Sequence, residues 1–153
     1  MSKLTTDDKK FYDPNIDRKN KIYNDAFKVT KDGAPIPSII EISNSGVCNR
    51  ECSFCPRSDP GYKHVKEFFS NKLHDKLCDD LSSYNFSGIF AYCGFNEPLL
   101  NKDINRDITY ARKKLPNSKI EIVTNGDVLN KERLQKLFDS GLSTILILSL
   151  IHI

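Results

Sequence analysis

Short apolar segments alternate with amphipathic segments along most of this chain, and this alternation limits the folds that the chain can adopt. Strands are predicted at residues 38–43, 88–93, 119–124 and 144–148. Short buried strands that are separated by amphipathic helices favour a parallel sheet with helices packed outside it. The fold class that we expect is therefore α/β.

Three helices are predicted between these strands. Apolar residues recur every four positions in the first, which predicts a helix over about residues 68–84. Asn101 is predicted to be the N-cap of the second, and Asn130 is predicted to cap the third, which Gly141 ends. The apolar face of the second helix consists of Ile104, Ile108, Ala111 and Leu115.

Residues 1–36 are predicted to form a polar, weakly structured extension, and residues 37–153 are predicted to form the folded domain. The extension contains turn or extended signals at Gly33 to Pro37. We expect its basic cluster to form solvated surface, with the side chains Arg18, Lys19 and Lys21.

Composition excludes several classes of function. The net charge of +3 is too small to indicate binding to nucleic acid. No apolar run reaches the roughly 18 residues that a membrane span needs. The 5 cysteines are an odd number and the start of the chain is polar, so that neither a disulfide framework nor a secretory signal is indicated. We therefore expect a reducing, cytoplasmic location.

Polar side chains follow each of the four predicted strands. The first strand leads into Cys48, the second into residues 94–98, the third into residues 124–126 and the fourth into Ser149. In parallel β/α folds the active site forms where the strands end and the loops begin. These four segments are therefore expected to converge on one side of the sheet.

Three cysteines in one short loop, Cys48, Cys52 and Cys55, are the strongest candidates for metal ligands. A four-iron cluster normally takes four thiolates, so three would leave one iron open to a small ligand. A structural zinc site would need a fourth ligand and commonly uses a second close pair of cysteines. Cys78 and Cys93 are isolated, and we expect both to be core residues. The loop is thus predicted to bind an iron–sulfur cluster, with zinc or no metal as the alternatives.

The C-x3-C-x2-C spacing, with Phe54 just before the third cysteine, resembles the radical S-adenosylmethionine (SAM) enzymes. Glu97-Pro98 and Thr124-Asn125-Gly126 match two further elements of that family. The resemblance implies a [4Fe-4S] cluster on the three cysteines and SAM at the open iron. It also implies an electron donor for the cluster and a peptide or small-molecule substrate.

The same resemblance implies that Gly94, Glu97 and Pro98 bind the methionine part of SAM, with Glu97 at the ammonium group. Phe95 and Asn96 depart from the family's Gly-Gly-Glu-Pro pattern. Four further residues have open interpretations. Phe54 either stacks near the cofactor or fills the core, Thr124 and Asn125 either form a turn or lie near the cofactor, and Ser149 either contacts the ribose or is an ordinary serine.

Cys55-Pro56-Arg57 most resembles the branch of the family that often carries a C-terminal SPASM extension. The family fold is a partial TIM-type barrel, and this chain supplies about its first four strands. We therefore expect an incomplete parallel (β/α) barrel and a truncated core. The expected function is that of a radical SAM enzyme or an N-terminal fragment of one. The alternatives are an inactive metal-binding fragment and a structural zinc-binding module.

Overall fold

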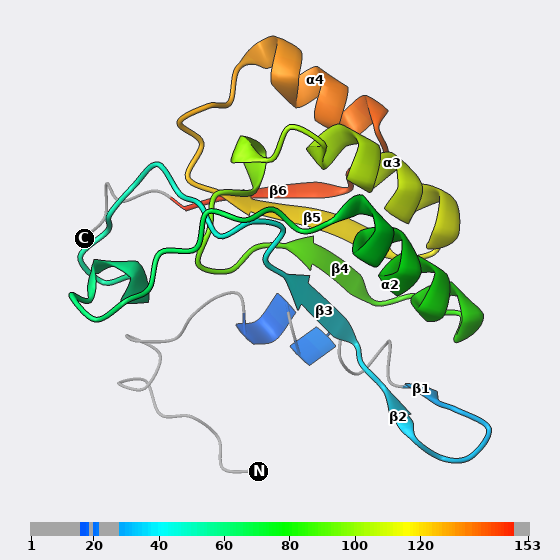
Figure 1. Cartoon of the computed structure of the whole chain (residues 1–153). Coiled ribbons are helices and arrows are strands. Elements are labelled where there is room, and N and C mark those ends of the chain that lie inside the picture. Colours follow the sequence, from blue (N-terminus) through cyan, green and yellow to red (C-terminus); the bar gives the residue numbers. More distant parts are fainter. Residues whose placement is uncertain (1–15, 19, 22–27, 149–153) are drawn as a thin grey trace, which may run out of the picture.

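The main sheet has four parallel strands in the order β3-β4-β5-β6, as predicted. The computed structural model describes residues 16–18, 20–21 and 28–148. The strands are β3 (Ile39–Ile42), β4 (Ile89–Tyr92), β5 (Lys119–Thr124) and β6 (Thr144–Ile147). Figure 1 shows them side by side in an open sheet, so that within the described residues the barrel is partial and not closed.

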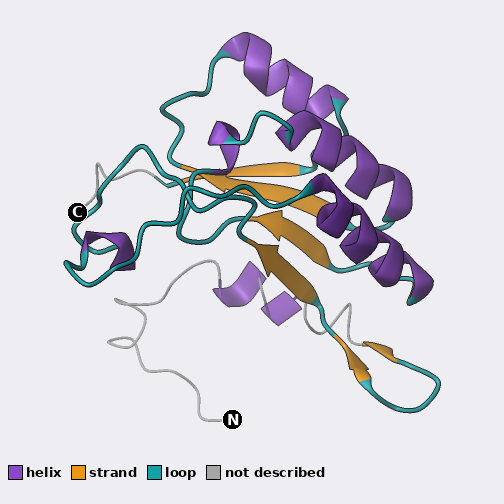
Figure 2. Ribbon diagram, viewed as in Figure 1, coloured by secondary structure: helices purple, strands orange, loops and turns teal. Residues whose placement is uncertain are grey.

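Three helices cover one face of this sheet, as Figure 2 shows. They are α2 (Asn71–Ser83), α3 (Ile104–Lys114) and α4 (Lys131–Asp139). Alternate residues of the strands point to the two faces of a sheet. On β4, Phe90 and Tyr92 join the larger core with the helices, whereas Ile89 and Ala91 belong to a smaller apolar cluster on the other face.

Two predicted helix starts were wrong, and each error has a local cause. α2 begins at Asn71 because Phe68 pairs with Ser45 in a β-bridge and the Phe69 backbone N–H donates to the Asn44 carbonyl. These contacts hold both phenylalanines in extended chain. Asn101 is not the N-cap of α3, since the cap position is Asp103.

Other boundaries were predicted correctly from local sequence. The Asn130 side chain accepts a hydrogen bond from the Arg133 backbone N–H and so caps α4 as expected. Gly141 follows that helix with a φ of +103°, a conformation that glycine adopts without strain.

The described part of the N-terminal region is more ordered than the sequence suggested. A short antiparallel hairpin joins β1 (Lys28–Val29) to β2 (Pro35–Ile36). The expected solvated cluster holds for the exposed Lys21, and Lys19 lies outside the described residues. Arg18 departs from it in part, because its guanidinium, 32% exposed, pairs with the Glu121 carboxylate at 2.6 Å. Glu121 is only 1% exposed, and a buried carboxylate needs a partner of this kind.

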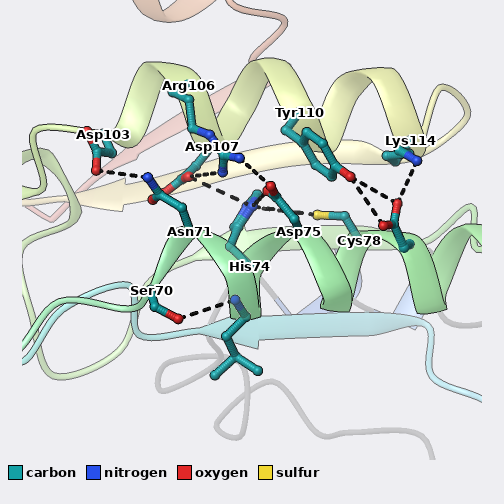
Figure 3. Close-up of polar contacts among 12 residues, drawn as sticks. Ser70, Asn71, His74, Asp75, Cys78, Asp103, Arg106, Asp107, Tyr110 and Lys114 are labelled. Atoms are coloured by element: carbon teal, nitrogen blue, oxygen red, sulfur yellow. Dashed lines mark hydrogen bonds and ion pairs between the residues drawn. The ribbon is translucent and has the colours of Figure 1, made fainter.

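A buried polar cluster ties α2 to α3 on the outer side of the sheet (Figure 3). His74 is fully buried, its Nε2 lies 2.8 Å from the Tyr92 hydroxyl, and its Nδ1 lies 3.8 Å from Asp107. Burial raises the pKa of the Asp107 carboxyl above its usual value. Arg106 pairs with both Asp75 and Asp107. No pattern in the sequence indicated a site at His74.

Among the described residues, no helix has the length and hydropathy needed to cross a bilayer.

Candidate active site

The loops that follow β3, β4 and β5 meet at one cavity of about 90 Å³. Its walls come from segments up to 100 positions apart in the sequence. The convergence of polar strand ends that the sequence predicted is therefore present for the first three strands. Seven of the predicted site residues line this cavity: Cys48, Cys52, Phe54, Cys55, Gly94, Glu97 and Asn125. Ser149 lies outside the described residues.

The three cysteines of the loop after β3 are free thiols and half-buried, whereas Cys78 and Cys93 are buried in the core as expected. Within the described chain, no three His, Cys, Asp or Glu side chains are grouped closely enough to hold a single metal ion. A four-iron cluster binds each thiolate through a different iron. Thiols that line one cavity without meeting at one point are compatible with that arrangement.

Arg57 anchors the cysteine loop to its surroundings, a role that no pattern in the sequence indicated. Arg57 is the second residue of the 3-10 helix η2 (Pro56–Ser58), which begins directly after Cys55, and it is 7% exposed. One guanidinium nitrogen donates to the carbonyls of Gly46 at 2.8 Å and Phe95 at 3.1 Å. These bonds connect the cysteine loop with the loop after β4.

Glu97 is 1% exposed and accepts three hydrogen bonds. Its Oε1 accepts from the Leu99 backbone N–H at 3.0 Å and from the Thr124 hydroxyl at 2.7 Å. Its Oε2 accepts from the Asn125 backbone N–H at 2.8 Å. A carboxylate has about four acceptor positions, so one is left on Oε2. Pro98 fixes the direction of the chain after Glu97 by opening the 3-10 helix η3 (Pro98–Leu100).

Asn96 departs from the family pattern, and its side-chain oxygen accepts no hydrogen bond. Its Nδ2 donates to the Asn44 Oδ1 at 2.8 Å, and the Asn44 Nδ2 donates to the Pro98 carbonyl at 3.3 Å. A carbonyl can only accept, which fixes the orientation of both amides. Asn96 is 9% exposed and lines the cavity, and its Oδ1 has no partner. The sequence showed the substitution but not its consequence.

Gly94 occupies a position that strongly favours glycine. Its φ is +109°, and an added Cβ would lie 2.2 Å from the Ser43 Oγ. The aromatic side chains at the rim are exposed, Phe54 by 59% and Phe95 by 54%. Phe54 therefore does not fill the core and is free to contact a molecule in the cavity.

The loop between β5 and α4 joins the two sides of the cavity. Thr124 and Asn125 both contact Glu97, and the Asn125 Nδ2 donates to the Asn49 Oδ1 at 2.8 Å and lies 4.0 Å from the Cys48 Sγ. Gly126 has a φ of +80°, so the segment is also a turn. Hydrogen bonds from Arg50 lower the pKa of Asp127 below its usual value.

A second cavity, of about 260 Å³, is lined by Arg18 and by residues of all four strands or their ends, among them Ile39, Ile89 and Ile147. Val123 and Leu148 line both cavities. Glu41, Ala91 and Glu121 occupy one row across neighbouring strands and form part of its floor. The second cavity therefore adjoins the first and carries two carboxylates of its own, those of Glu41 and Glu121.

Comparison with known proteins gives a consistent result. The Radical SAM superfamily matches residues 42–148. The chain is 33% identical over 110 residues to S-adenosyl-L-methionine-dependent 2-deoxy-scyllo-inosamine dehydrogenase of Niallia circulans. It is 28% identical over 138 residues to Fe-coproporphyrin III synthase of Methanosarcina barkeri (strain Fusaro / DSM 804). These alignments cover 72% and 80% of this chain but only 44% and 32% of the two relatives.

Solved structures agree with the observed fold. BtrN in complex with AdoMet and 2-DOIA superposes with a TM-score of 0.70 at 30% identity, over 73% of this chain and 45% of that chain. Selenomethionine BtrN in an open conformation gives a TM-score of 0.67 at 28% identity, over 76% and 58% of the two chains. The chain thus spans less than two thirds of the length of each of these proteins.

Proposed function

The chain belongs to the radical SAM superfamily, and from this we propose that its cysteine loop holds a [4Fe-4S] cluster that binds and cleaves SAM. Cys48, Cys52 and Cys55 are the proposed ligands. The observation that carries the proposal is the single cavity that contains all three thiols together with Glu97 and Asn125. When bound and reduced, the cluster would supply the electron that splits SAM into methionine and a 5′-deoxyadenosyl radical able to take a hydrogen atom from a substrate.

The residues around Glu97 are proposed to bind the methionine part of SAM. The free acceptor position on Glu97 and the partnerless Asn96 Oδ1 suit an ammonium group, which carries three N–H donors. Gly94 leaves the space that a side chain would take, and Pro98 orients Glu97. The charge of Glu97 favours a cation in this buried position.

The adenosine part of SAM is proposed to lie against the other predicted site residues, which are Phe54, Thr124, Asn125 and Ser149. Phe54 offers an exposed ring for stacking at the rim. Thr124 and Asn125 hold the wall on the β5 side through their bonds with Glu97. Ser149 is proposed as a polar contact for the ribose.

The substrate is proposed to approach from the second cavity, since that cavity shares Val123 and Leu148 with the first. The names of the two relatives describe enzymes that act on small organic molecules. We therefore favour a small molecule for this chain. The resemblance of Cys55-Pro56-Arg57 to the SPASM-type branch supports the peptide alternative. A set of candidate small molecules and peptides tested for consumption with SAM would distinguish them.

The proposal includes a reducing, cytoplasmic setting and an electron-donating partner, because the cluster would need an external electron for each cleavage. It also treats residues 37–153 as part of the radical SAM core and residues 1–36 as an extension. Since the chain spans 44% and 32% of its two relatives, the substrate and the complete reaction of the whole protein remain part of the proposal.

A second candidate function is metal binding without catalysis. The observation behind it is that the three half-buried thiols of the cavity would hold iron whether or not SAM is cleaved. In that case iron would bind as proposed, but SAM would not be cleaved. A zinc-binding module would instead retain zinc after anaerobic purification and show no sulfide.

The test is anaerobic reconstitution with iron and sulfide, followed by iron and sulfide analysis and an absorption spectrum. The intact chain should take up about four irons, the content of one such cluster. Cys48→Ala should lose this uptake, whereas Cys78→Ala, which removes a core cysteine, should retain it. Equal loss of iron in both variants would contradict the assignment of the ligands.

A further inference from the structure

Asn49 and Arg50, two of the three residues between the first two cysteines of the loop, reach the same carboxylate. The Asp127 Oδ2 accepts from the Asn49 Nδ2 at 3.1 Å and from the Arg50 Nε at 2.7 Å. The Asp127 Oδ1 accepts a further bond from the Arg50 guanidinium. The contact between Arg50 and Asp127 is therefore bidentate, the form in which the two groups fix each other's orientation.

Asp127 is itself held in place. Its backbone N–H donates to the Asn125 Oδ1 at 2.9 Å, while the Asn125 side chain also donates to Asn49 at 2.8 Å. The Asn125 backbone N–H is fixed by the buried Glu97 at 2.8 Å. A continuous set of hydrogen bonds therefore runs from the interior of the domain through Asn125 and Asp127 to the cysteine loop.

The cysteine loop forms few backbone hydrogen bonds of its own. The backbone N–H groups of residues 49–54 donate to no backbone carbonyl among the described residues, and the first such bond in the loop runs from Cys55 to Cys52 at 2.9 Å. A segment without backbone hydrogen bonds samples many conformations unless side chains hold it. The side chains of Asn49 and Arg50 hold the part between Cys48 and Cys52, whereas the Ser58 hydroxyl donates to the Ser53 carbonyl at 3.1 Å in the part that follows.

We propose that Asp127 is a positioning residue, which holds the segment between Cys48 and Cys52 in the conformation that accepts the cluster. Asp127 touches neither the cluster nor SAM in this account and acts only through Asn49 and Arg50. The proposal rests on the proposed function in one respect, the identity of the group that the loop accepts.

Because the Arg50–Asp127 ion pair is partly exposed, its loss should change only the cysteine loop. The side chains of Arg50 and Asp127 are 29% and 36% exposed. Ion pairs that are exposed to this degree contribute little to the stability of the whole fold. Loss of the contact should therefore change the order of the cysteine loop while the thermal unfolding of the domain stays nearly the same. An incidental surface ion pair would change neither.

The test uses hydrogen–deuterium exchange on the metal-free chain, read at the amides of Gly46 and Cys55, which are the two in residues 46–56 that donate to backbone carbonyls. Asp127→Asn removes the charge at constant size, and Asn49→Leu removes the neighbouring contact from the other side. Each should speed exchange at these two amides by about tenfold, the factor expected when one charge-assisted hydrogen bond is lost from a local opening. Glu132→Gln is the matched control, since it removes an exposed ion pair of α4 with Lys136 at 2.7 Å that does not touch the loop.

A double variant in which the charges of Arg50 and Asp127 are exchanged tests whether the ion pair itself protects the loop. Asp127→Arg combined with Arg50→Asp should recover part of the protection that Asp127→Asn loses, and iron uptake on reconstitution should fall and recover in parallel. Unchanged exchange at the amides of Gly46 and Cys55 in both single variants, or no recovery in the exchanged pair, would overturn the proposal. If the intact chain takes up no iron, the proposed function fails, but the exchange measurement still tests the role of Asp127.

Discussion

The Glu97 carboxylate accepts a hydrogen bond from the Thr124 hydroxyl at 2.7 Å, and each of these residues is only 1% exposed. This contact joins the loop after β4 to the end of β5. Because the Glu97 backbone N–H also donates to the Val47 carbonyl at 2.8 Å, Glu97 is connected to the cysteine loop as well. One buried residue thus links three of the strand ends that form the cavity, two through its carboxylate and one through its backbone N–H.

Glu97→Gln should weaken SAM binding while the cluster is retained. A glutamine would turn an NH2 group toward one of the donors that now face the carboxylate, and it would remove the charge that suits an ammonium group. The dissociation constant of SAM should rise roughly tenfold to hundredfold, as for a lost hydrogen bond to a charged group. Equilibrium dialysis on the reconstituted protein measures this, with Glu132→Gln as the control. An unchanged dissociation constant would count against a role for Glu97 in SAM binding.

The five cysteines should differ sharply in reactivity in the metal-free folded chain. Burial raises the pKa of the Cys78 thiol to about 12, so that almost no thiolate forms there at pH 8. Cys93 is also buried, whereas the three thiols of the loop are half-buried and line the cavity. Iodoacetamide at pH 8 should modify Cys48, Cys52 and Cys55, and mass spectrometry of peptides should find Cys78 and Cys93 unmodified. All five should react in denaturant, and rapid labelling of Cys78 in the folded chain would disagree with its burial.

The free energy of unfolding should depend on pH in the alkaline range through the same residue. The folded-state pKa of Cys78 is raised from 9.0 to about 12. Its contribution is therefore complete below pH 9 and is lost as the pH rises toward 12, at up to about 1.4 kcal/mol per pH unit. Urea unfolding across this range measures the slope. Cys78→Ala should be less stable overall because of the cavity, but its slope should be smaller, and an identical slope would contradict this explanation.

Arg18→Met should destabilise the domain by leaving Glu121 buried without a partner. Removal of one member of a buried ion pair costs about 3–5 kcal/mol, and we expect the lower end because the Arg18 side chain is 32% exposed. Adding Glu121→Gln to Arg18→Met should restore much of the stability, since no charge is then buried alone. Urea denaturation of the single and double variants tests this. Equal stability of Arg18→Met and the intact chain would show that Glu121 has another adequate partner.

Features set by neighbouring residues could be predicted from the sequence. The limits of β5 and the cap at Asn130 depend on side chains within a few positions, and both were predicted correctly. The gathering of the strand ends followed from the parallel topology, which places the carboxyl ends of all strands at one edge.

Features that depend on contacts between distant segments could not be predicted. The start of α2 depends on pairing between Phe68 and Ser45, and the ion pair of Arg18 depends on Glu121, which lies 103 positions away. The free acceptor of Asn96 likewise follows from the orientation of Asn44. Neither local propensity nor apolar spacing contains this information.

The most direct test of the central claim is the electron paramagnetic resonance spectrum of the reconstituted, chemically reduced protein with and without SAM. If Cys48, Cys52 and Cys55 hold a four-iron cluster with one open iron, the reduced protein should give a signal of such a cluster, and SAM should shift it. The shift should be weaker at the same SAM concentration in Glu97→Gln. A cluster signal that SAM leaves unchanged at saturating concentration, or no cluster signal after reconstitution, would contradict the account.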